Sequence, residues 1–367
     1  MKPISPIRKA CAARLTAELA SLKQDRAAGV KIAGYTCHSV PAAVIAGVGM
    51  RPVRVLCGTS AEAESAGEKV VRPDVCPLVR TLLGNVGEQR GVHGDVDIWI
   101  GLQTCDAMRR GFDVLAGQHG REVHSIQLPA TRTPEAAGYF ADQVRRLVAD
   151  LEARHGVRFY PDAAVAWQGH WDAAAAVLMR ALRGGRISPL DGHALFHLLL
   201  VSRPEGLAGF IEQQIAASPA YEGTRTIVLT GSPLALEDTV LLEELEARGF
   251  SVLPLNCTGL NALEAPVAQA PADNLVGTLA LRSFSLPACM RARPNTVVYD
   301  RIGTTLKETA AAGLIVKSLK FCDHWYTERE RLRRTFDLPV LVFDSDYAEG
   351  GRERLLSRID AFIETVE

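Results

Sequence analysis

Short apolar runs alternate with longer segments of helical periodicity along most of this chain. Eight of these runs have the length of a strand and are separated by helical or turn-forming segments. Continuous apolar character is typical of strands that helices cover on both faces of a parallel sheet. We therefore predict an α/β protein with parallel sheets, whose strands lie at residues 31–35, 52–56, 96–102, 122–128, 225–230, 251–255, 313–321 and 339–343.

The region from residue 161 to residue 218 interrupts this alternation, because its apolar residues follow helical spacing only. At about 150 residues per domain, a chain of 367 residues accommodates two domains. The sequence thus predicts an N-terminal helix (1–30), a first α/β domain (31–160), a helical connector (161–218) and a second α/β domain (219–367). Individual helices are expected at residues 42–48, 107–116, 134–155, 236–248, 306–312 and 352–365.

The charge balance and the length of the apolar runs limit the partners and the compartment. The 41 Lys and Arg residues nearly cancel the 42 Asp and Glu residues, so no basic excess points to nucleic acid. No apolar run approaches the roughly 18–20 residues of a membrane helix, and no signal peptide is recognisable at the N-terminus. We expect a cytoplasmic protein with neither a nucleic-acid nor a membrane partner, in which thiols stay reduced.

The eight cysteines are the unusual part of the composition. None has the CxxC spacing of zinc ribbons, thioredoxin-like motifs or ferredoxin-type cluster motifs. Cys76 and Cys289 stand in turn-like segments, and Cys11 lies on the apolar stripe of the N-terminal helix, where we expect a core residue. Four others directly follow predicted strands, at the sheet edge where α/β proteins bind ligands: Cys57, Cys105, Cys257 and Cys322.

An ordered set of short motifs surrounds most of these cysteines. They are GYTCHSVP (34–41), GMRPVR (49–54), VCPLVR (75–80), QTCDAM (103–108), QLP (127–129), LKFCD (319–323), DSDY (344–347) and SRIDAFIE (357–364). In this order the set resembles the 2-hydroxyacyl-CoA dehydratase and benzoyl-CoA reductase superfamily, which includes the double-cubane cluster proteins. The resemblance extends over nearly the whole chain and implies two Rossmann-like domains joined by a helical segment, with an oxygen-sensitive iron–sulfur cluster in the cleft between them.

The resemblance also implies a set of cluster ligands. The three cysteines shared by the family correspond to Cys76, Cys105 and Cys322, which would hold a [4Fe-4S] cube with one iron left open. Further cysteines resemble those of the double-cubane branch, in which six cysteines hold a bridged [8Fe-9S] cluster, and this form is favoured. Four candidates compete for the three additional places, so one of them is not a ligand: Cys37, Cys57, Cys257 and Cys289. Cys37 is favoured as a ligand or near-cluster thiol by its Tyr-x-Cys context.

The implied activity is ATP-dependent, low-potential reduction of a small molecule. Electrons would come from a separate ATP-hydrolysing iron–sulfur activator, and this chain has no P-loop motif of its own, so ATP is expected on the partner only. One alternative is a single-cluster subunit of a 2-hydroxyacyl-CoA dehydratase or benzoyl-CoA-type reductase that acts on a CoA thioester. Either would be a homodimer or a heterodimer with a related chain. Another alternative is a metal-free α/β binding protein.

Histidines beside the proposed ligands are candidates for proton delivery. His38 and His324 each lie within two residues of such a cysteine. Ala42 and Ala43 stand where many relatives have acidic residues, which weakens a standard dehydratase assignment. Two alternatives stand for Arg291, Arg293 and Arg301, namely contact with CoA phosphates or a partner and a solvated basic face, and the solvated face is the expected one.

Overall fold

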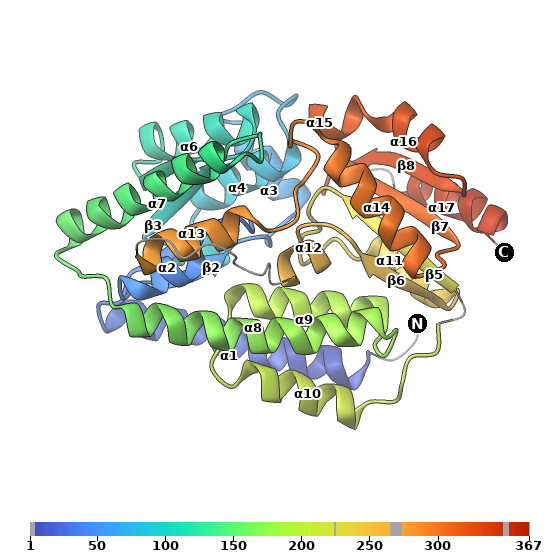
Figure 1. The fold of residues 1–367 in the computed structure, drawn as a ribbon, viewed down its shortest axis with the longest axis horizontal. Helices are drawn as coiled ribbons and strands as arrows, with labels where there is room; N and C mark the ends of the chain where they lie inside the picture. The colour runs from blue at the N-terminus through green and yellow to red at the C-terminus, as the bar shows by residue number, and fades with distance from the viewer. Residues whose placement is uncertain (1–3, 224, 265–273, 348–351, 367) are drawn as a thin grey trace.

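The computed structural model describes residues 4–223, 225–264, 274–347 and 352–366. In this part of the chain, strands form two four-stranded sheets in which every strand pair is parallel. Each predicted run overlaps one strand, which confirms an α/β fold with two Rossmann-like, parallel-sheet domains (Figure 1). The first sheet contains β1 (Ile32–Tyr35), β2 (Arg51–Arg54), β3 (Ile98–Gln103) and β4 (Glu122–Gln127), and the second contains β5 (Arg225–Gly231), β6 (Phe250–Pro254), β7 (Gly313–Leu319) and β8 (Val340–Ser345).

Both sheets have the same strand order relative to the chain, β2-β1-β3-β4 and β6-β5-β7-β8. In each sheet the second strand lies on one side of the first strand, and the third strand lies on the other side. The connections therefore reverse direction between β1 and β3, and again between β5 and β7. A crevice forms at the carboxyl ends of the strands at such a reversal, and open α/β sheets bind their ligands there.

Helices cover both faces of the first sheet. Neighbouring strand residues point to opposite faces, so Ile98 shares a core with α2 (Ala42–Gly47) and α7 (Pro134–His155), and Trp99 packs on the other face. The helix predicted at residues 134–155 has these bounds. Its first turn is capped by the Thr133 hydroxyl, and Gly156, with a φ of 65°, ends it. The other helices of this domain are α3 (Ala61–Gly67), α4 (Pro77–Gly87), α5 (Gly91–Asp95) and α6 (Asp106–Gly117).

The chain returns once from the second domain to the first. Helix α13 (Leu275–Phe284) follows β6 in sequence but packs against α7, where the rings of Phe140 and Phe284 lie 5.6 Å apart. After α13, the backbone N–H of Arg293 donates to the carbonyl of Ala130 at 2.9 Å. A segment that the sequence assigns to the second domain is therefore docked on the first.

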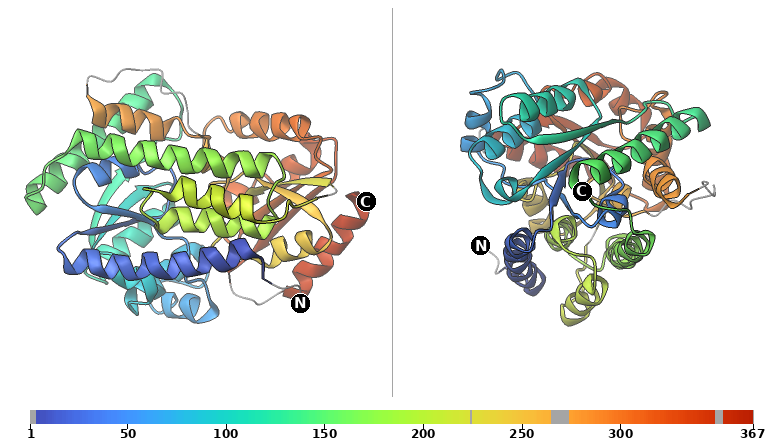
Figure 2. Two further views of the ribbon diagram at one scale, coloured as in Figure 1. Left: turned by 90° about the horizontal axis from the view of Figure 1, so that it is seen from below. Right: turned by 90° about the vertical axis from the view of Figure 1, so that its left-hand side faces the viewer.

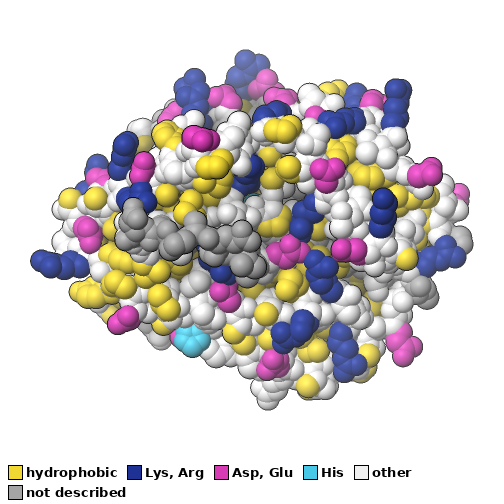
Figure 3. Space-filling view, in the orientation of Figure 1, with side chains coloured by type: hydrophobic (Ala, Val, Ile, Leu, Met, Phe, Trp, Pro, Cys, Tyr) yellow, Lys and Arg dark blue, Asp and Glu magenta, His cyan; other side chains and the backbone are white. Residues whose placement is uncertain are grey.

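A helical layer lies beneath both sheets (Figures 1 and 2). It consists of α1 (Pro6–Ala27), α8 (Pro161–Arg183), α9 (Pro189–Val201) and α10 (Leu207–Ala217). Cys11 of α1 is buried in the core, as expected. No helix in the described residues is both long and apolar enough to cross a membrane. On the face drawn in Figure 3, acidic and basic side chains are interspersed, without a large area of one sign.

Two helices of the second domain differ from the predicted bounds. Helix α11 (Val240–Ala247) begins after residue 236, because Leu236 N–H donates to the Leu56 carbonyl at 3.0 Å and so binds this segment to the first domain. The helix predicted at 306–312 overlaps α14 (Thr296–Glu308) only at residues 306–308. Helix α14 begins ten residues earlier than predicted, and it ends before residue 312 because Ala310 turns the chain with a φ of 45°. The remaining helices are α12 (Leu260–Leu263), α15 (Asp323–Tyr326), α16 (Arg329–Thr335) and α17 (Arg352–Val366).

Candidate metal centre

One cavity between the two sheets contains six of the seven cysteines expected as ligands. It encloses about 1060 Å³, part of which is continuous with solvent, and it is lined by residues that follow β1, β3, β5, β6 and β7. Both strand-order reversals therefore open into the same space. The cysteines in its lining are Cys37, Cys76, Cys105, Cys257, Cys289 and Cys322.

Three of these cysteines directly precede helices, because each occupies the turn between an extended segment and a helix. Cys76 is the N-cap of α4, and Pro77 fixes the first helical residue. Cys105 is the N-cap of α6, where its Sγ accepts the backbone N–H of Met108 at 3.5 Å. Cys322 precedes the short helix α15. Each of these three thiols therefore lies where a helix begins, at the lining of the cavity.

Cys76, Cys105 and Cys322 form a first thiol triad, in which each thiol interacts electrostatically with another member. Burial, followed by the nearby thiols of Cys322 and Cys105, raises the pKa of Cys76 to about 12. Burial also raises the pKa of Cys322, and Cys105 adds to that rise against a hydrogen bond from Trp325 N–H. Two members come from before the helical connector and one from after it.

Cys37, Cys257 and Cys289 form a second thiol triad. Burial is the main cause that raises the pKa of each of these thiols. The three thiols also act on one another. Cys257 further raises the pKa of Cys37, Cys289 that of Cys257, and Cys37 that of Cys289. The two triads adjoin, because Cys289 also raises the pKa of Cys322. Here one member precedes the connector and two follow it.

Buried cations face the thiols in the cavity. Among the described residues its lining contains no Asp or Glu, but it includes Arg54 and Arg291, which are 3% and 7% exposed. Arg54 donates to the carbonyls of Thr36 and Cys257 at 2.8 and 2.7 Å, and its Nη2 atom has no hydrogen-bond partner among the described residues.

Arg291 likewise donates only to carbonyl groups, those of Thr104, Leu128 and Pro129. Neither Arg291 nor Arg54 forms an ion pair within the described ranges. Buried charge without a counter-charge is costly, so the cavity is electrostatically suited to an anionic group. The expectation that Arg291 lies on a solvated face is wrong, because the segment between α13 and α14 is docked against the carbonyls that follow β3 and β4.

Both proposed histidines line the same cavity. Burial and then the charge of Arg54 lower the pKa of His38 to about 3. Its Nε2 lies 3.4 Å from the Pro287 carbonyl, and its Nδ1 lies 3.9 Å from Cys37 Sγ. His324 is half-buried, and burial followed by the charges of Arg293 and Arg291 lowers its pKa.

Cys57 lies apart from the other proposed ligands, in a second cavity lined also by His93 and His197. The chain turns at Gly58, with a φ of 74°, and the Asn85 side chain holds the Gly58 carbonyl at 2.8 Å. Burial and then the charge of Glu237 raise the pKa of Cys57 to about 12. Of the four cysteines that compete for three places, the structure thus separates Cys57 from the second thiol triad.

Sequence reasoning did not identify the buried arginines as part of the site. Arg54 ends the run that forms β2, and a charged residue inside such a run is the signal that could have found it. Ser232 is a further polar residue of the site. Its Oγ accepts the N–H of Leu319 at 3.0 Å and lines the cavity at the end of β5. The hydrogen bond between Ser232 and Leu319 forms because β5 and β7 are neighbours in the second sheet. The order of strands in a sheet cannot be read from the sequence.

Two parallel-sheet domains with a cysteine-lined cavity between them place this chain among the two-domain α/β proteins whose site lies between the sheets. The family model described as "2-hydroxyglutaryl-CoA dehydratase, D-component" matches residues 37–366. The chain therefore belongs to this family, which confirms the resemblance found in its motifs. It is also similar to the Escherichia coli (strain K12) protein "Putative dehydratase subunit YjiM", with 24% identity over 356 residues, covering 92% of this chain and 91% of that protein.

Proposed function

We propose that this chain is an iron–sulfur enzyme subunit that carries out ATP-dependent, low-potential reduction of a small molecule. The observation that carries the proposal is the pair of thiol triads in one cavity, beside two buried arginines and with no carboxylate among its described lining residues. In the proposal, the first thiol triad holds one cube and the second thiol triad holds the other, as a double-cubane [8Fe-9S] cluster. Six thiolates are soft ligands of the kind that bind iron–sulfur clusters.

The spacing of the thiols supports a cluster over a single ion. No three cysteine thiols among the described residues lie within 4.8 Å of one another. One tetrahedral zinc ion, with Zn–S bonds of about 2.3 Å, would hold its sulfurs roughly 3.8 Å apart. A cube spreads its three thiolate ligands over three irons and so accepts a wider spacing. When bound, such a cluster would supply low-potential electrons; an open iron belongs only to a single cube held by three thiolates.

The protein side chains then have separate tasks. Arg54 and Arg291 balance the negative charge of the thiolates and hold the loops after β1 and β3 through carbonyl groups. His38 is kept neutral by its burial, and a proton on Nε2 donates to Pro287 while Nδ1 faces the Cys37 thiol. His324 lines the cavity and is partly exposed, so it is the better placed of the two to carry a proton from solvent.

The partners follow from what this chain lacks and from its family. Its sequence has no P-loop, so in the proposal ATP is hydrolysed on a separate iron–sulfur activator that delivers electrons one at a time. A D-component is by name one component of several, and the E. coli relative is named as a subunit. We therefore infer a dimer, with a second copy or a related chain, in addition to the activator.

The family name favours a second candidate function, a single-[4Fe-4S] subunit of a 2-hydroxyacyl-CoA dehydratase that acts on a CoA thioester. One local feature speaks against the standard form of this enzyme. Ala42 and Ala43 stand where many relatives carry acidic residues, and both are buried against the core of the first domain. A carboxylate for proton transfer is therefore absent from the start of α2.

The test is the iron and acid-labile sulfide content of the protein prepared without oxygen. The double-cubane proposal predicts about eight irons per chain, and the single-cluster alternative predicts about four. A colourless protein without iron would contradict both and leave a metal-free binding protein. Addition of the ATP-hydrolysing activator with ATP should then bleach or shift the cluster absorbance, whereas ATP alone should have no effect.

A further inference from the structure

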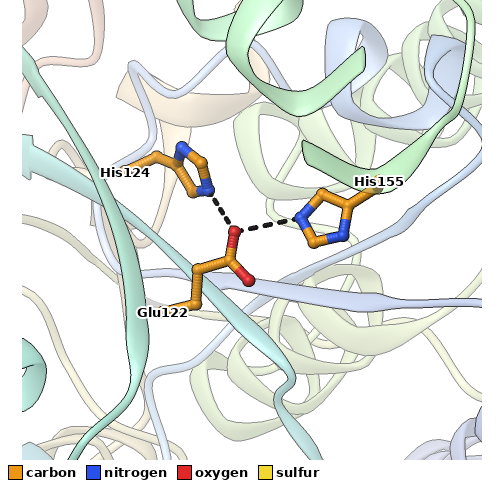
Figure 4. A group of neighbouring side chains, drawn as sticks. All are labelled: Glu122, His124 and His155. Atoms are coloured by element: carbon orange, nitrogen blue, oxygen red, sulfur yellow. Dashed lines mark hydrogen bonds and ion pairs between the residues drawn. The ribbon is translucent and has the colours of Figure 1, made fainter. Parts of the chain in front are cut away.

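A second group of ligand-type side chains lies at the opposite edge of the first sheet from the thiol triads. Glu122 is the first residue of β4 and His124 follows two positions later, so both point to the same face of the strand. His155 is the last residue of α7, which runs back along this strand (Figure 4). The side chains of Glu122, His124 and His155 are 32%, 5% and 15% exposed.

The three ligand atoms converge on one point. Glu122 Oε1 lies 2.6 Å from His124 Nε2 and 3.0 Å from His155 Nε2. All three atoms lie within 4.8 Å of one another, and no other set of three or more His, Cys, Asp and Glu ligand atoms meets this condition in the described ranges. Figure 4 shows both imidazole rings directed at the same carboxylate oxygen.

The far side of the His124 ring is also bound. Its Nδ1 lies 2.8 Å from Asp150 Oδ2, and Arg154 holds the other oxygen of Asp150 at 2.9 Å. A neutral imidazole carries one proton, so if Nδ1–H donates to Asp150, the lone pair of Nε2 faces the Glu122 carboxylate. At 2.6 Å, the repulsion between two such atoms is removed by a proton between them, or by a metal ion once the ligands move slightly apart. A carboxylate on the second nitrogen is the arrangement found behind metal-bound histidines.

We propose that Glu122, His124 and His155 bind a divalent first-row transition ion, with zinc as the representative. Two imidazoles and one carboxylate suit zinc better than magnesium or calcium, which prefer oxygen ligands. Bond lengths of about 2.0–2.2 Å in a tetrahedron place ligand atoms roughly 3.3 Å apart, so the side chains need to move by less than about 1 Å. The carbonyl end of the α7 dipole adds a favourable negative potential for a cation.

The site would connect the start of the edge strand β4 to the end of α7, remote from the cysteine cavity. Three protein ligands leave one coordination position, which the partly exposed Glu122 side opens to solvent. The proposal therefore does not depend on the proposed function. A bound ion would resist fraying of the outer edge of the first domain, because it holds two consecutive elements at the end where they separate.

The test compares zinc binding by the anaerobically prepared, cluster-containing protein and by two variants, after dialysis against the same zinc concentration. His155→Ala removes a ligand at a helix end, and His170→Ala removes an exposed histidine of α8 as the matched control. Any zinc bound to free thiols is common to all three proteins. We expect H155A to hold one equivalent less than wild type and H170A to hold the same amount.

Two further readouts keep the test decisive. Zinc should raise the Tm of wild type and H170A but not of H155A, and an anomalous diffraction peak should lie beside His124 Nε2. Asp150→Asn should weaken zinc binding by roughly 10- to 100-fold without removing a ligand. Equal zinc content in wild type and H155A would overturn the proposal. The Glu122, His124 and His155 group would then be explained by a protonated imidazole between carboxylates. If H155A fails to fold, E122Q provides the same comparison.

Discussion

At the scale of single residues, Cys37 and Cys57 are both candidates for the three additional ligand places in the sequence, and the structure places them in different cavities. Cys37 follows β1 and lines the cavity with the other members of the second thiol triad. Cys57 follows β2, at the edge of the sheet, and lies in a separate cavity. The difference arises because the strand-order reversal lies beside β1 and not beside β2.

This separation predicts different effects of two matched substitutions. Cys57→Ala should leave the iron content of the anaerobically purified protein unchanged, because its thiol does not reach the six-cysteine cavity. Cys37→Ala should lower the iron content by roughly half or more, because it removes one of three ligands of a cube. Iron and sulfide per chain measure both. Equal iron losses in the two variants would show that the second thiol triad is wrongly assigned.

The buried arginines mark the limit of residue-level prediction. A guanidinium at the end of β2 is visible in the sequence, but its burial is not. Arg54 is enclosed because the Cys257 carbonyl, 203 positions away, approaches from the second sheet. Arg54 belongs to the site only because of the way the two domains face each other. No local sequence pattern contains that arrangement. Cys105, Cys257 and Cys322 were easier to identify, because strand ends place them at a ligand-binding edge, whereas the other cavity cysteines were expected from the family resemblance.

At the scale of secondary-structure elements, α1 is fixed to the first sheet by a buried ion pair. Glu18 Oε2 lies 2.9 Å from Arg51 Nη2, and the two side chains are 7% and 3% exposed. Arg51 also reaches Asp25 at 2.6 Å and Ser21 at 2.7 Å. Arg51 begins β2, so one guanidinium joins the N-terminal helix to the edge of the sheet.

Glu18→Ala should lower the free energy of unfolding by about 3–5 kcal/mol, because it leaves a buried guanidinium with fewer partners. Urea unfolding of the metal-free protein, followed by circular dichroism, measures this. The matched control is Arg145→Ala in the exposed pair with Asp142, where the change should stay below about 1 kcal/mol. A loss of less than 1 kcal/mol for E18A would contradict the anchoring role.

The elements themselves were largely predictable, because buried parallel strands are short apolar runs and long helices carry caps. The misplaced boundaries have a tertiary cause. Helix α11 starts late because Glu237, just before it, binds the backbone N–H of Gly58 at 2.8 Å in the other domain. Helix α13 was not predicted, and its packing on α7 of the first domain is a long-range contact that no local pattern contains.

At the scale of the whole molecule, buried neutral histidines make stability depend on pH. Burial lowers the pKa of His93 to about 4, against a hydrogen bond with Arg90 that would raise it. The unfolded chain has a histidine pKa of about 6.5, so between about pH 4 and 6.5 only the unfolded state binds this proton. Stability from His93 is therefore complete above pH 6.5 and is lost as the pH falls toward 4.

His93→Gln should reduce the pH dependence of the metal-free protein. From pH 6 to pH 5, the wild type should lose about 1 kcal/mol more unfolding free energy than H93Q, because one proton is linked to unfolding. His170→Gln, at an exposed position, should behave as wild type. Urea denaturation at the two pH values provides the measurement, and an unchanged difference in H93Q would refute the contribution of His93.

Each thiol triad draws on both sides of the helical connector, two members to one in the first and one to two in the second. Neither half of the chain alone can offer three thiols of one triad. If the triads hold the proposed cubes, maturation has a fixed order: the chain must close before iron and sulfide are inserted. The proteins that insert the cluster would then act on a chain that is already folded. Loss of the cluster would remove the covalent connection that it makes between the two halves of the chain.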